Sequence, residues 1–246
     1  MSEHPFAPLP TQHPLRWESR DEGVLRAVTH RLGGVSEGPY DGLNLGGHVG
    51  DDPTAVARNR ALVEEAVGTP VAYMDQVHGA DVVHVRAAGG PPTCDAMVSD
   101  TRGVTLAVLV ADCTPVLLHD ARAGVVGAAH AGRPGMLAGV VPATVAAMRD
   151  LGAEQITATL GPSVCGRCYE VPAAMREDAA ATSPASYAMT WQGTPAIDVA
   201  AGVVEQLAAL DVAVQWLPGC TREDPTLYSY RRDGTTGRLA GLVGLA

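Results

Sequence analysis

The stretch from Asp75 to Gly135 sets the organisation of this chain through three segments: Gln76-Val77-His78-Gly79, Val110-Ala111-Asp112-Cys113 and Ala129-His130-Ala131-Gly132. A histidine, a cysteine and a histidine each stand at the end of an apolar, strand-like run, just before a turn. Two imidazoles and one thiolate with an open fourth position are the ligands of a catalytic zinc site. The alternative is a buried cysteine and two separate histidines with backbone partners. This alternative stays open because residues this far apart in sequence indicate a metal site less strongly than a CxxC pair does.

Composition limits the class of protein. The length of 246 residues is ample for a core, and with a single phenylalanine that core must consist of Val, Ala and Leu. The formal charge of −10 argues against nucleic acid as a partner. Five thinly spread cysteines fit a reducing cytosol better than a disulfide framework. No targeting segment is visible and the longest apolar run, Val104 to Ala111, is too short to cross a bilayer, so we expect a cytoplasmic protein with no membrane partner.

Apolar periodicity predicts alternating strands and helices in one domain. Strands are expected at residues 23–29, 71–77, 82–86, 104–110, 116–119, 125–129, 156–160, 212–217 and 239–245. Helices are expected at residues 54–67, 137–149, 173–181 and 197–210, the first of them capped by Asp52. No repeat or linker interrupts the chain, so we predict a flexible N-terminal arm over residues 1–15 and a single catalytic domain over residues 16–246.

A glycine-rich segment spans residues 30–50 and cannot form a core element. It lacks the Lys-Ser/Thr ending of a P-loop, so it does not predict that nucleotide site. On composition it fits a long surface loop. Its polar side chains nevertheless suit the wall of a pocket: Arg31, Ser36, Asn44 and His48.

At this point the motifs resemble those of a known family. Its successive blocks are similar to His30-Arg-Leu-Gly-Gly-Val-Ser, Leu43-Asn-Leu-Gly, Gln76-Val-His-Gly, Ala111-Asp-Cys, Ala129-His-Ala-Gly, Leu160-Gly-Pro and Ser229-Tyr-Arg-Arg-Asp-Gly. In this order, from about Val24 to the C-terminus, they resemble the YfiH family. That family has been labelled polyphenol oxidase or laccase-domain protein, and later purine nucleoside phosphorylase with adenosine deaminase activity.

The resemblance implies an α+β fold, a compact single domain with packed mixed sheets flanked by helices. It also implies that His78, Cys113 and His130 are catalytic zinc ligands, with Cu²⁺ as the alternative metal. The expected substrates are a purine nucleoside and inorganic phosphate, and we expect a monomer or weak homodimer. A zinc ion in such a site lowers the pKa of bound water to about 7, which suits deamination at C6 of adenine.

One motif departs from the family pattern. The family commonly continues its last metal histidine with Ala-Gly-Trp-Arg-Gly, whereas this chain has Arg133 directly after Gly132, followed by Pro134. Phosphate binding calls for arginine forks. The candidates for contact with substrate or phosphate are Arg31, Ser36, Asn44, Arg133, Arg231 and Arg232, with Arg31 and Asn44 also expected in the catalytic set. Asp112 either orients a metal-binding histidine or caps the next turn.

Two other functions are compatible with the resemblance. A copper-dependent polyphenol oxidase would use the blue-copper-like set of two imidazoles and a thiolate. A four-copper centre needs many histidines, and this chain has only eight, with no His-x-His pair. The second of these other functions is an editing role for a peptidoglycan precursor. The pair Cys165 and Cys168 forms a lone CxxC, which we interpret as surface thiols or an occasional disulfide, with a redox role or a second metal site as the alternative.

Overall fold

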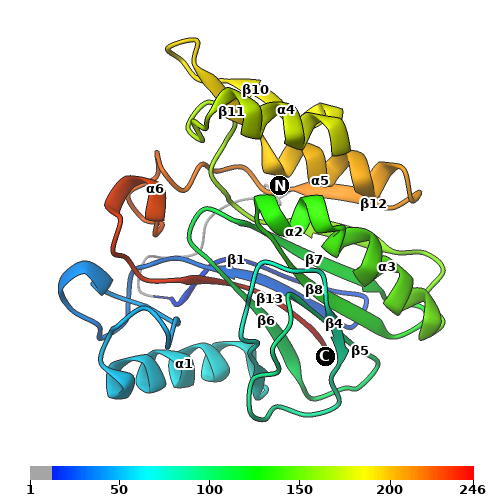
Figure 1. Cartoon of the computed structure of the whole chain (residues 1–246). Coiled ribbons are helices and arrows are strands. Elements are labelled where there is room, and N and C mark those ends of the chain that lie inside the picture. The colour runs from blue at the N-terminus through cyan, green and yellow to red at the C-terminus, as the bar shows by residue number, and fades with distance from the viewer. Residues whose placement is uncertain (1–12) are drawn as a thin grey trace, which may run out of the picture.

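The structure is a computed structural model that describes residues 13–246. Within that range two large β-sheets stack face to face, and helices cover both outer faces (Figure 1). This arrangement confirms the predicted α+β fold with packed mixed sheets flanked by helices. Most of the arm predicted over residues 1–15 lies outside the described residues, and Leu15 begins the first strand.

The first sheet has five strands in the spatial order β1, β2, β13, β6, β3. Their bounds are β1 (Leu15–Asp21), β2 (Val24–Thr29), β13 (Leu239–Leu245), β6 (Thr105–Val110) and β3 (Val71–Ala72). The neighbours pair antiparallel except β3 and β6, which are parallel. The helix α1 (Pro53–Val67) covers the outer face, starting at Asp52 as predicted, because the Asp52 carboxylate accepts the N–H of Thr54.

The second sheet has six strands in the order β12, β9, β7, β8, β5, β4. Their bounds are β12 (Ala213–Trp216), β9 (Thr157–Leu160), β7 (Thr114–Asp120), β8 (Val125–Ala131), β5 (Ala96–Ser99) and β4 (Val82–His84). Its outer face carries α2 (Arg133–Ala138), α3 (Val140–Asp150) and α5 (Val199–Ala208). Further out lie α4 (Ala173–Thr182), the turn η2 (Pro184–Ser186) and the hairpin of β10 (Tyr187–Met189) and β11 (Pro195–Ile197), while η1 (Gly38–Tyr40) and α6 (Tyr230–Asp233) belong to loops.

The continuous apolar runs of the sequence arise because both faces of the central strands are buried. In β6, Leu106 and Val108 face the second sheet, whereas Ala107 and Leu109 face α1. Successive residues of a strand point to opposite faces, so a strand between two apolar layers needs apolar residues throughout. The same alternation holds in β7. The core is therefore three apolar layers, and the strand ends between them are free to carry polar chemistry.

Several predicted elements differ from the observed ones. The strand β1 was not predicted, and the strand expected at 71–77 is reduced to Val71–Ala72. The helix expected at 137–149 begins earlier, at Arg133, and is divided into α2 and α3 by Gly139, whose φ of 84° is left-handed. The helix expected at 197–210 is shorter, Val199–Ala208. Within residues 13–246 no helix has the length and apolar composition needed to cross a membrane.

Candidate metal centre

The structure brings His78, Cys113 and His130 together. His78 lies in the loop between β3 and β4, Cys113 in the turn joining β6 to β7, and His130 near the end of β8. The pairing of β7 with β8 places Pro115 opposite His130, so the Cys113 turn lies beside that end of β8. The Cys113 Sγ is 3.8 Å from His78 Nε2, and one ligand atom from each residue lies within 4.8 Å of the others. The two imidazole rings meet edge to face, with centroids 4.7 Å apart.

A fully buried carboxylate, Asp95, holds two of these residues in place, His78 through its backbone and His130 through its ring. It accepts the backbone N–H groups of Val77, His78 and Gly79 at 3.2, 2.9 and 2.6 Å. It also lies 2.9 Å from Nδ1 of His130, which leaves Nε2 of that ring for a metal. Burial alone would raise the pKa of Asp95, but the hydrogen bonds from His130 and Gly79 lower it below its ordinary value. Asp95 is thus the anion that fixes the geometry of the site.

Asp112 takes neither of the two roles considered for it, the orientation of a metal-binding histidine or the capping of the next turn. Its carboxylate accepts hydrogen bonds from the Thr221 and Ser229 hydroxyls and from the Arg231 N–H, each at 2.6 Å, and not from a histidine. Its φ is 98°, a left-handed value that is costly for a residue with a side chain. These three bonds hold the unusual backbone that aims the adjacent Cys113 into the site. The orientation of a metal-binding histidine belongs to Asp95 instead.

The charges of the site favour a thiolate at Cys113. Desolvation alone would raise the pKa of this thiol, but His130 and His78 lower it to about 6. Desolvation would lower the pKa of His130, but Cys113 and Asp95 raise it. The chain therefore supplies an anionic sulfur between two imidazoles.

The donor set and the space around it fit a metal ion. Two imidazoles and one thiolate suit zinc or copper and leave one position open. The neighbouring Gly132 keeps the space clear, since a Cβ at this position would lie 2.9 Å from both Cys113 Sγ and His78 Cδ2. A glycine is therefore required here by the close approach of the ligands, and its φ of −77° shows that backbone conformation is not the reason.

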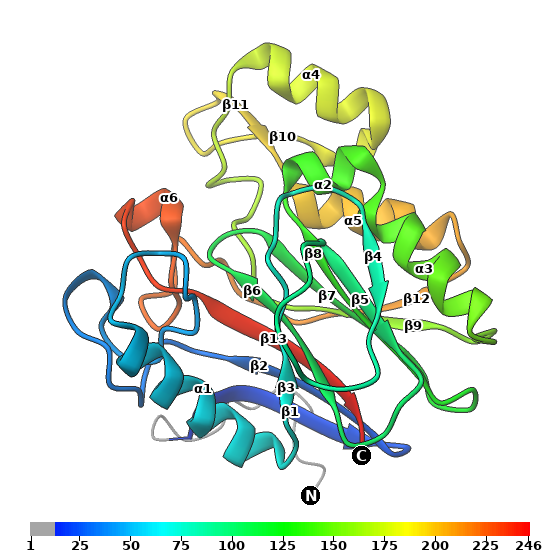
Figure 2. The ribbon, with the colours of Figure 1, turned by 60° about the horizontal axis from the view of Figure 1, so that its bottom comes forward.

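A cavity of about 390 Å³ opens onto the three residues, within the roughly 300–1,000 Å³ of small-molecule sites. Figure 2 shows the β6–β7 turn between α6 and α2, two of the elements that border this cavity. Three arginines line it: Arg133, Arg231 and Arg238. Its other polar and aromatic lining includes His48, Gln76, Tyr169 and Tyr230. One cavity thus combines a candidate metal group, several cations and aromatic rings.

Four of the predicted substrate residues do not line this cavity. Ser36 and Asn44 are buried, and both donate to the Asp51 carboxylate. The Arg31 guanidinium lies over the Tyr228 ring, 4.8 Å from its centroid. Arg232 donates to the backbone carbonyls of Thr221, Asp224 and Leu227 among others. These residues shape the loops around the site, and Asn44 Oδ1 accepts the N–H of Arg238 at 2.8 Å.

No role was predicted for Asp95, Arg238 or Tyr169 from the sequence, and the structure places all three at the site. Arg238 stands in the glycine-bearing C-terminal segment. It contacts Asn44, which is 194 positions away in the sequence, so only the folded chain brings the two together. Asp95 directly precedes β5, a place where an aspartate is ordinary. The residues next to Asp95 and Arg238 in the sequence therefore do not indicate that either one lies at the site.

We expect Asp95→Asn to weaken metal affinity about 10- to 100-fold, the usual cost of removing a partner that orients a ligand. An amide must turn its NH₂ group towards either the backbone donors or Nδ1 of His130, so at least one contact becomes unfavourable. Chelator competition on the purified variant measures the change. The exposed Asp178→Asn variant, with the same loss of charge, should match wild type. Equal affinity in both variants would contradict the role of Asp95.

Comparison with known proteins places the chain in a family. The family model for multi-copper polyphenol oxidoreductase laccase matches residues 25–246. The chain is 58% identical over 232 residues to a protein named purine nucleoside phosphorylase from Streptomyces coelicolor, covering 91% of this chain and 96% of that one. It is 40% identical over 234 residues to purine nucleoside phosphorylase YfiH of Escherichia coli, covering 91% and 95%.

Solved structures with similar folds support the same family. A Neisseria meningitidis protein has a TM-score of 0.83 at 41% identity, covering 91% of this chain and 94% of that one. YlmD from Geobacillus stearothermophilus has a TM-score of 0.81 at 33% identity, covering 91% and 92%. The sequence motifs, the fold and these matches agree along almost the whole described chain. The chain therefore belongs to the YfiH family of laccase-domain proteins.

Proposed function

We propose that the chain is a zinc-dependent purine nucleoside phosphorylase that also deaminates adenosine. The observation that carries the proposal is the cavity that joins His78, Cys113 and His130 to three arginines. The names of the relatives, purine nucleoside phosphorylase, support the same reaction class. A zinc ion held by the three residues would supply Lewis acidity and lower the pKa of a bound water to about 7.

Phosphorolysis requires that phosphate and nucleoside share one site. A phosphate oxygen bonds to C1′ of the ribose while the bond from C1′ to N9 breaks, and the purine leaves with the electron pair and takes up a proton. Arg133 and Arg231 are suited to hold the phosphate because a guanidinium presents a fork of donors to an anion. Within residues 13–246 no acceptor is bonded to the Arg133 guanidinium, so its donors are available to a ligand.

The aromatic side chains of the cavity are suited to the base. Tyr169 lies on the wall with the Arg231 guanidinium 4.8 Å from its ring centroid, which gives that ring a fixed orientation. A purine is a flat apolar ring with polar edges, so an aromatic face is a natural contact for it. Gln76 is held by two hydrogen bonds to the Leu109 backbone, at 2.8 Å each, and so forms a rigid part of the wall. These residues bind and orient; they do not themselves react.

The test measures products with and without phosphate. Inosine should yield hypoxanthine and ribose 1-phosphate only when phosphate is present, whereas adenosine should yield inosine and ammonia without it. Base release that ignores phosphate would overturn the phosphorylase. The polyphenol oxidase alternative, which rests on the family description, requires oxidation of a phenolic dye by copper-loaded protein. Turnover of the dye with no release of base would favour that alternative.

We expect Arg133→Met to weaken phosphate-dependent base release about 10- to 100-fold, the range given by a charge-assisted hydrogen bond of roughly 1.5–3 kcal/mol. Phosphate-independent deamination should change much less, because no anion is needed. Arg133→Lys keeps the charge but loses the fork, and should lie between wild type and Arg133→Met. The measurement is the phosphate dependence of hypoxanthine release from inosine.

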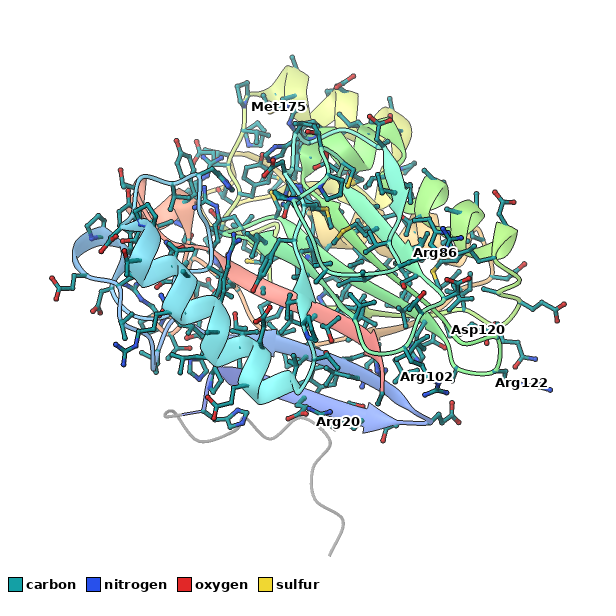
Figure 3. The ribbon with its side chains drawn as sticks, turned by 90° about the horizontal axis from the view of Figure 1, so that it is seen from below. Arg20, Arg86, Arg102, Asp120, Arg122 and Met175 are labelled. Atoms are coloured by element: carbon teal, nitrogen blue, oxygen red, sulfur yellow. The ribbon has the colours of Figure 1, made fainter. Side chains whose placement is uncertain are left out.

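The matched control is Arg122→Met, since Arg122 is exposed and projects from the periphery of the molecule, away from the cavity residues (Figure 3). It should match wild type in both reactions. An unchanged half-saturation for phosphate in Arg133→Met would remove Arg133 from the phosphate site. Equal loss of both reactions would indicate damage to the candidate metal group instead.

A further inference from the structure

A second group of potential metal ligands lies outside the cavity. It consists of Cys165, Cys168, Cys220 and Glu223, with one ligand atom from each within 4.8 Å of the others. Cys168 is only 4% exposed, so it is not the surface thiol that the sequence suggested. Cys220 and Glu223 were not associated with the CxxC pair, because they follow it by more than fifty residues. The four come from the loop between β9 and α4 and the loop between β12 and α6.

The two loops form matching turns at this place. In the first, the N–H groups of Cys168 and Tyr169 both donate to the carbonyl of Cys165, at 2.9 and 3.1 Å. In the second, the N–H groups of Glu223 and Asp224 both donate to the carbonyl of Cys220, at 3.1 and 2.9 Å. Each turn therefore presents potential ligands at its first and fourth positions. Paired turns with this short spacing are typical of structural zinc sites.

Backbone contacts fix the two turns against each other. Ser163 and Cys220 form a parallel bridge, in which the Thr221 N–H donates to the Ser163 carbonyl at 3.1 Å. The Cys165 N–H donates to Cys220 Sγ at 3.5 Å. The Cys168 thiol donates to Glu223 Oε1 at 3.3 Å. The ligands are thus assembled by the main chain.

We propose that Cys165, Cys168, Cys220 and Glu223 bind a second, structural zinc ion. Thiolates select soft or borderline metals such as zinc, and four protein ligands leave no position for a substrate. In a tetrahedron with Zn–S bonds of about 2.3 Å the sulfur atoms are about 3.8 Å apart, so the observed spacing needs only a small contraction. A disulfide would use two of the thiols and leave the third thiol and the carboxylate without a role.

The charges near the group are consistent with this ligand set. Three thiolates, one carboxylate and one Zn²⁺ carry a net charge of −2. Each turn has an arginine at its third position, Arg167 in the first and Arg222 in the second. Both arginines are exposed and flank the group, and together they offset its charge.

The second ion would hold one wall of the candidate active site. Thr221, within the second turn, donates its hydroxyl to Asp112 at 2.6 Å. The N–H of Val164, just before the first turn, donates to the carbonyl of Asp112 at 2.9 Å. Asp112 in turn aims Cys113, and Tyr169 follows the first turn into the cavity. The four ligands are therefore positioning residues that act through Asp112 and Tyr169 and do not touch substrate.

The first test is the zinc content of metal-replete protein purified under reducing conditions. We expect two zinc ions per wild-type chain, one in Cys168→Ser and in Cys220→Ser, and none in the double variant Cys113→Ser/Cys168→Ser. The control Cys94→Ala removes a buried cysteine that belongs to neither group, and should keep both ions. Cobalt substitution distinguishes the sites, since three thiolates should give stronger sulfur-to-metal absorption than one. One ion in wild type and one in Cys168→Ser would overturn the proposal.

The second test uses wild-type protein and is independent of whether the serine variants fold. Alkylation followed by peptide mass spectrometry should find Cys165, Cys168 and Cys220 protected with zinc and reactive after chelation under reducing conditions. Equal reactivity with and without the chelator would contradict the site. A mass lower by two hydrogens, with no zinc at this group, would show a disulfide instead. Neither result depends on the nucleoside reaction, so failure here leaves the proposed function standing.

Discussion

Replacing His78, Cys113 or His130 by alanine is expected to remove one zinc ion per chain and reduce nucleoside turnover to background. The three ligand atoms lie within 4.8 Å of one another, so each substitution leaves two protein ligands where a catalytic zinc site needs three. Zinc content by elemental analysis and base release from inosine measure the two effects. The loss should be nearly complete, which makes it the largest functional effect that we expect.

The fold should survive these changes to different extents. His78 is exposed and Cys113 is half-buried, so their truncation leaves little space in the core. His130 is 2% exposed and is the side-chain hydrogen-bond partner of the buried Asp95, so its removal leaves a cavity and takes one partner from that carboxylate. We therefore expect a lower Tm for His130→Ala than for the other two.

His84→Ala is the matched control for these variants. This histidine pairs with Asp100 at 2.8 Å on β4 and is not among the residues that line the cavity. It should keep full zinc content and turnover. Stoichiometric zinc and normal turnover in all three ligand variants would show that the metal, if any, is bound elsewhere in the chain.

The central strands were predictable because their signal is local. Strands at 104–110 and 116–119 agree with β6 and β7, since a strand buried on both faces requires an unbroken apolar run. The edge strand β1 was missed, because its second half, Glu18 to Asp21, is polar and partly or fully exposed. The stacking of the two sheets is a contact between distant segments and leaves no periodicity in the sequence.

The candidate site was predictable in its ligands but not in its supports. His78, Cys113 and His130 stand in motifs with an unusual composition at strand ends, and chain topology then brings them together. Arginines were harder to assign, since charge and neighbouring glycines do not distinguish a ligand contact from a backbone contact. Arg232 illustrates this: its guanidinium donates to the carbonyl of Leu227 at 2.7 Å and so holds a loop. The backbone carbonyl that a guanidinium contacts depends on the folded loop and is not encoded in the neighbouring sequence.

Gly132→Ala is expected to remove zinc from the first site and lower turnover about 100-fold or more, although it changes no ligand. The added Cβ would lie 2.9 Å from Cys113 Sγ and 2.9 Å from His78 Cδ2, closer than a Cβ tolerates. One of these side chains must move by a few tenths of an ångström or more, and misplacement on the scale of 1 Å costs about 10²-fold in rate.

Backbone strain does not account for this effect. Gly132 has φ −77° and ψ 172°, which alanine adopts readily, and it caps the N-terminus of α2 without a side-chain bond. The fold should therefore lose at most about 1 kcal/mol, the scale of a change at such a cap. Gly90→Ala is the control, because a Cβ at Gly90 would meet no atom within 4 Å. It should keep zinc, turnover and Tm.

A double variant separates the steric effect from general damage. Cys113→Ala already lacks the zinc ion and turnover, so the double variant is compared with it in Tm. If the Cβ acts only by meeting Cys113 and His78, adding Gly132→Ala should cost no more than the roughly 1 kcal/mol expected at this cap. A larger loss of stability would mean that the substitution also acts elsewhere, for example on α2. Full zinc content and turnover in Gly132→Ala alone would mean that Cys113 and His78 do not approach each other around a metal, and would reject this site.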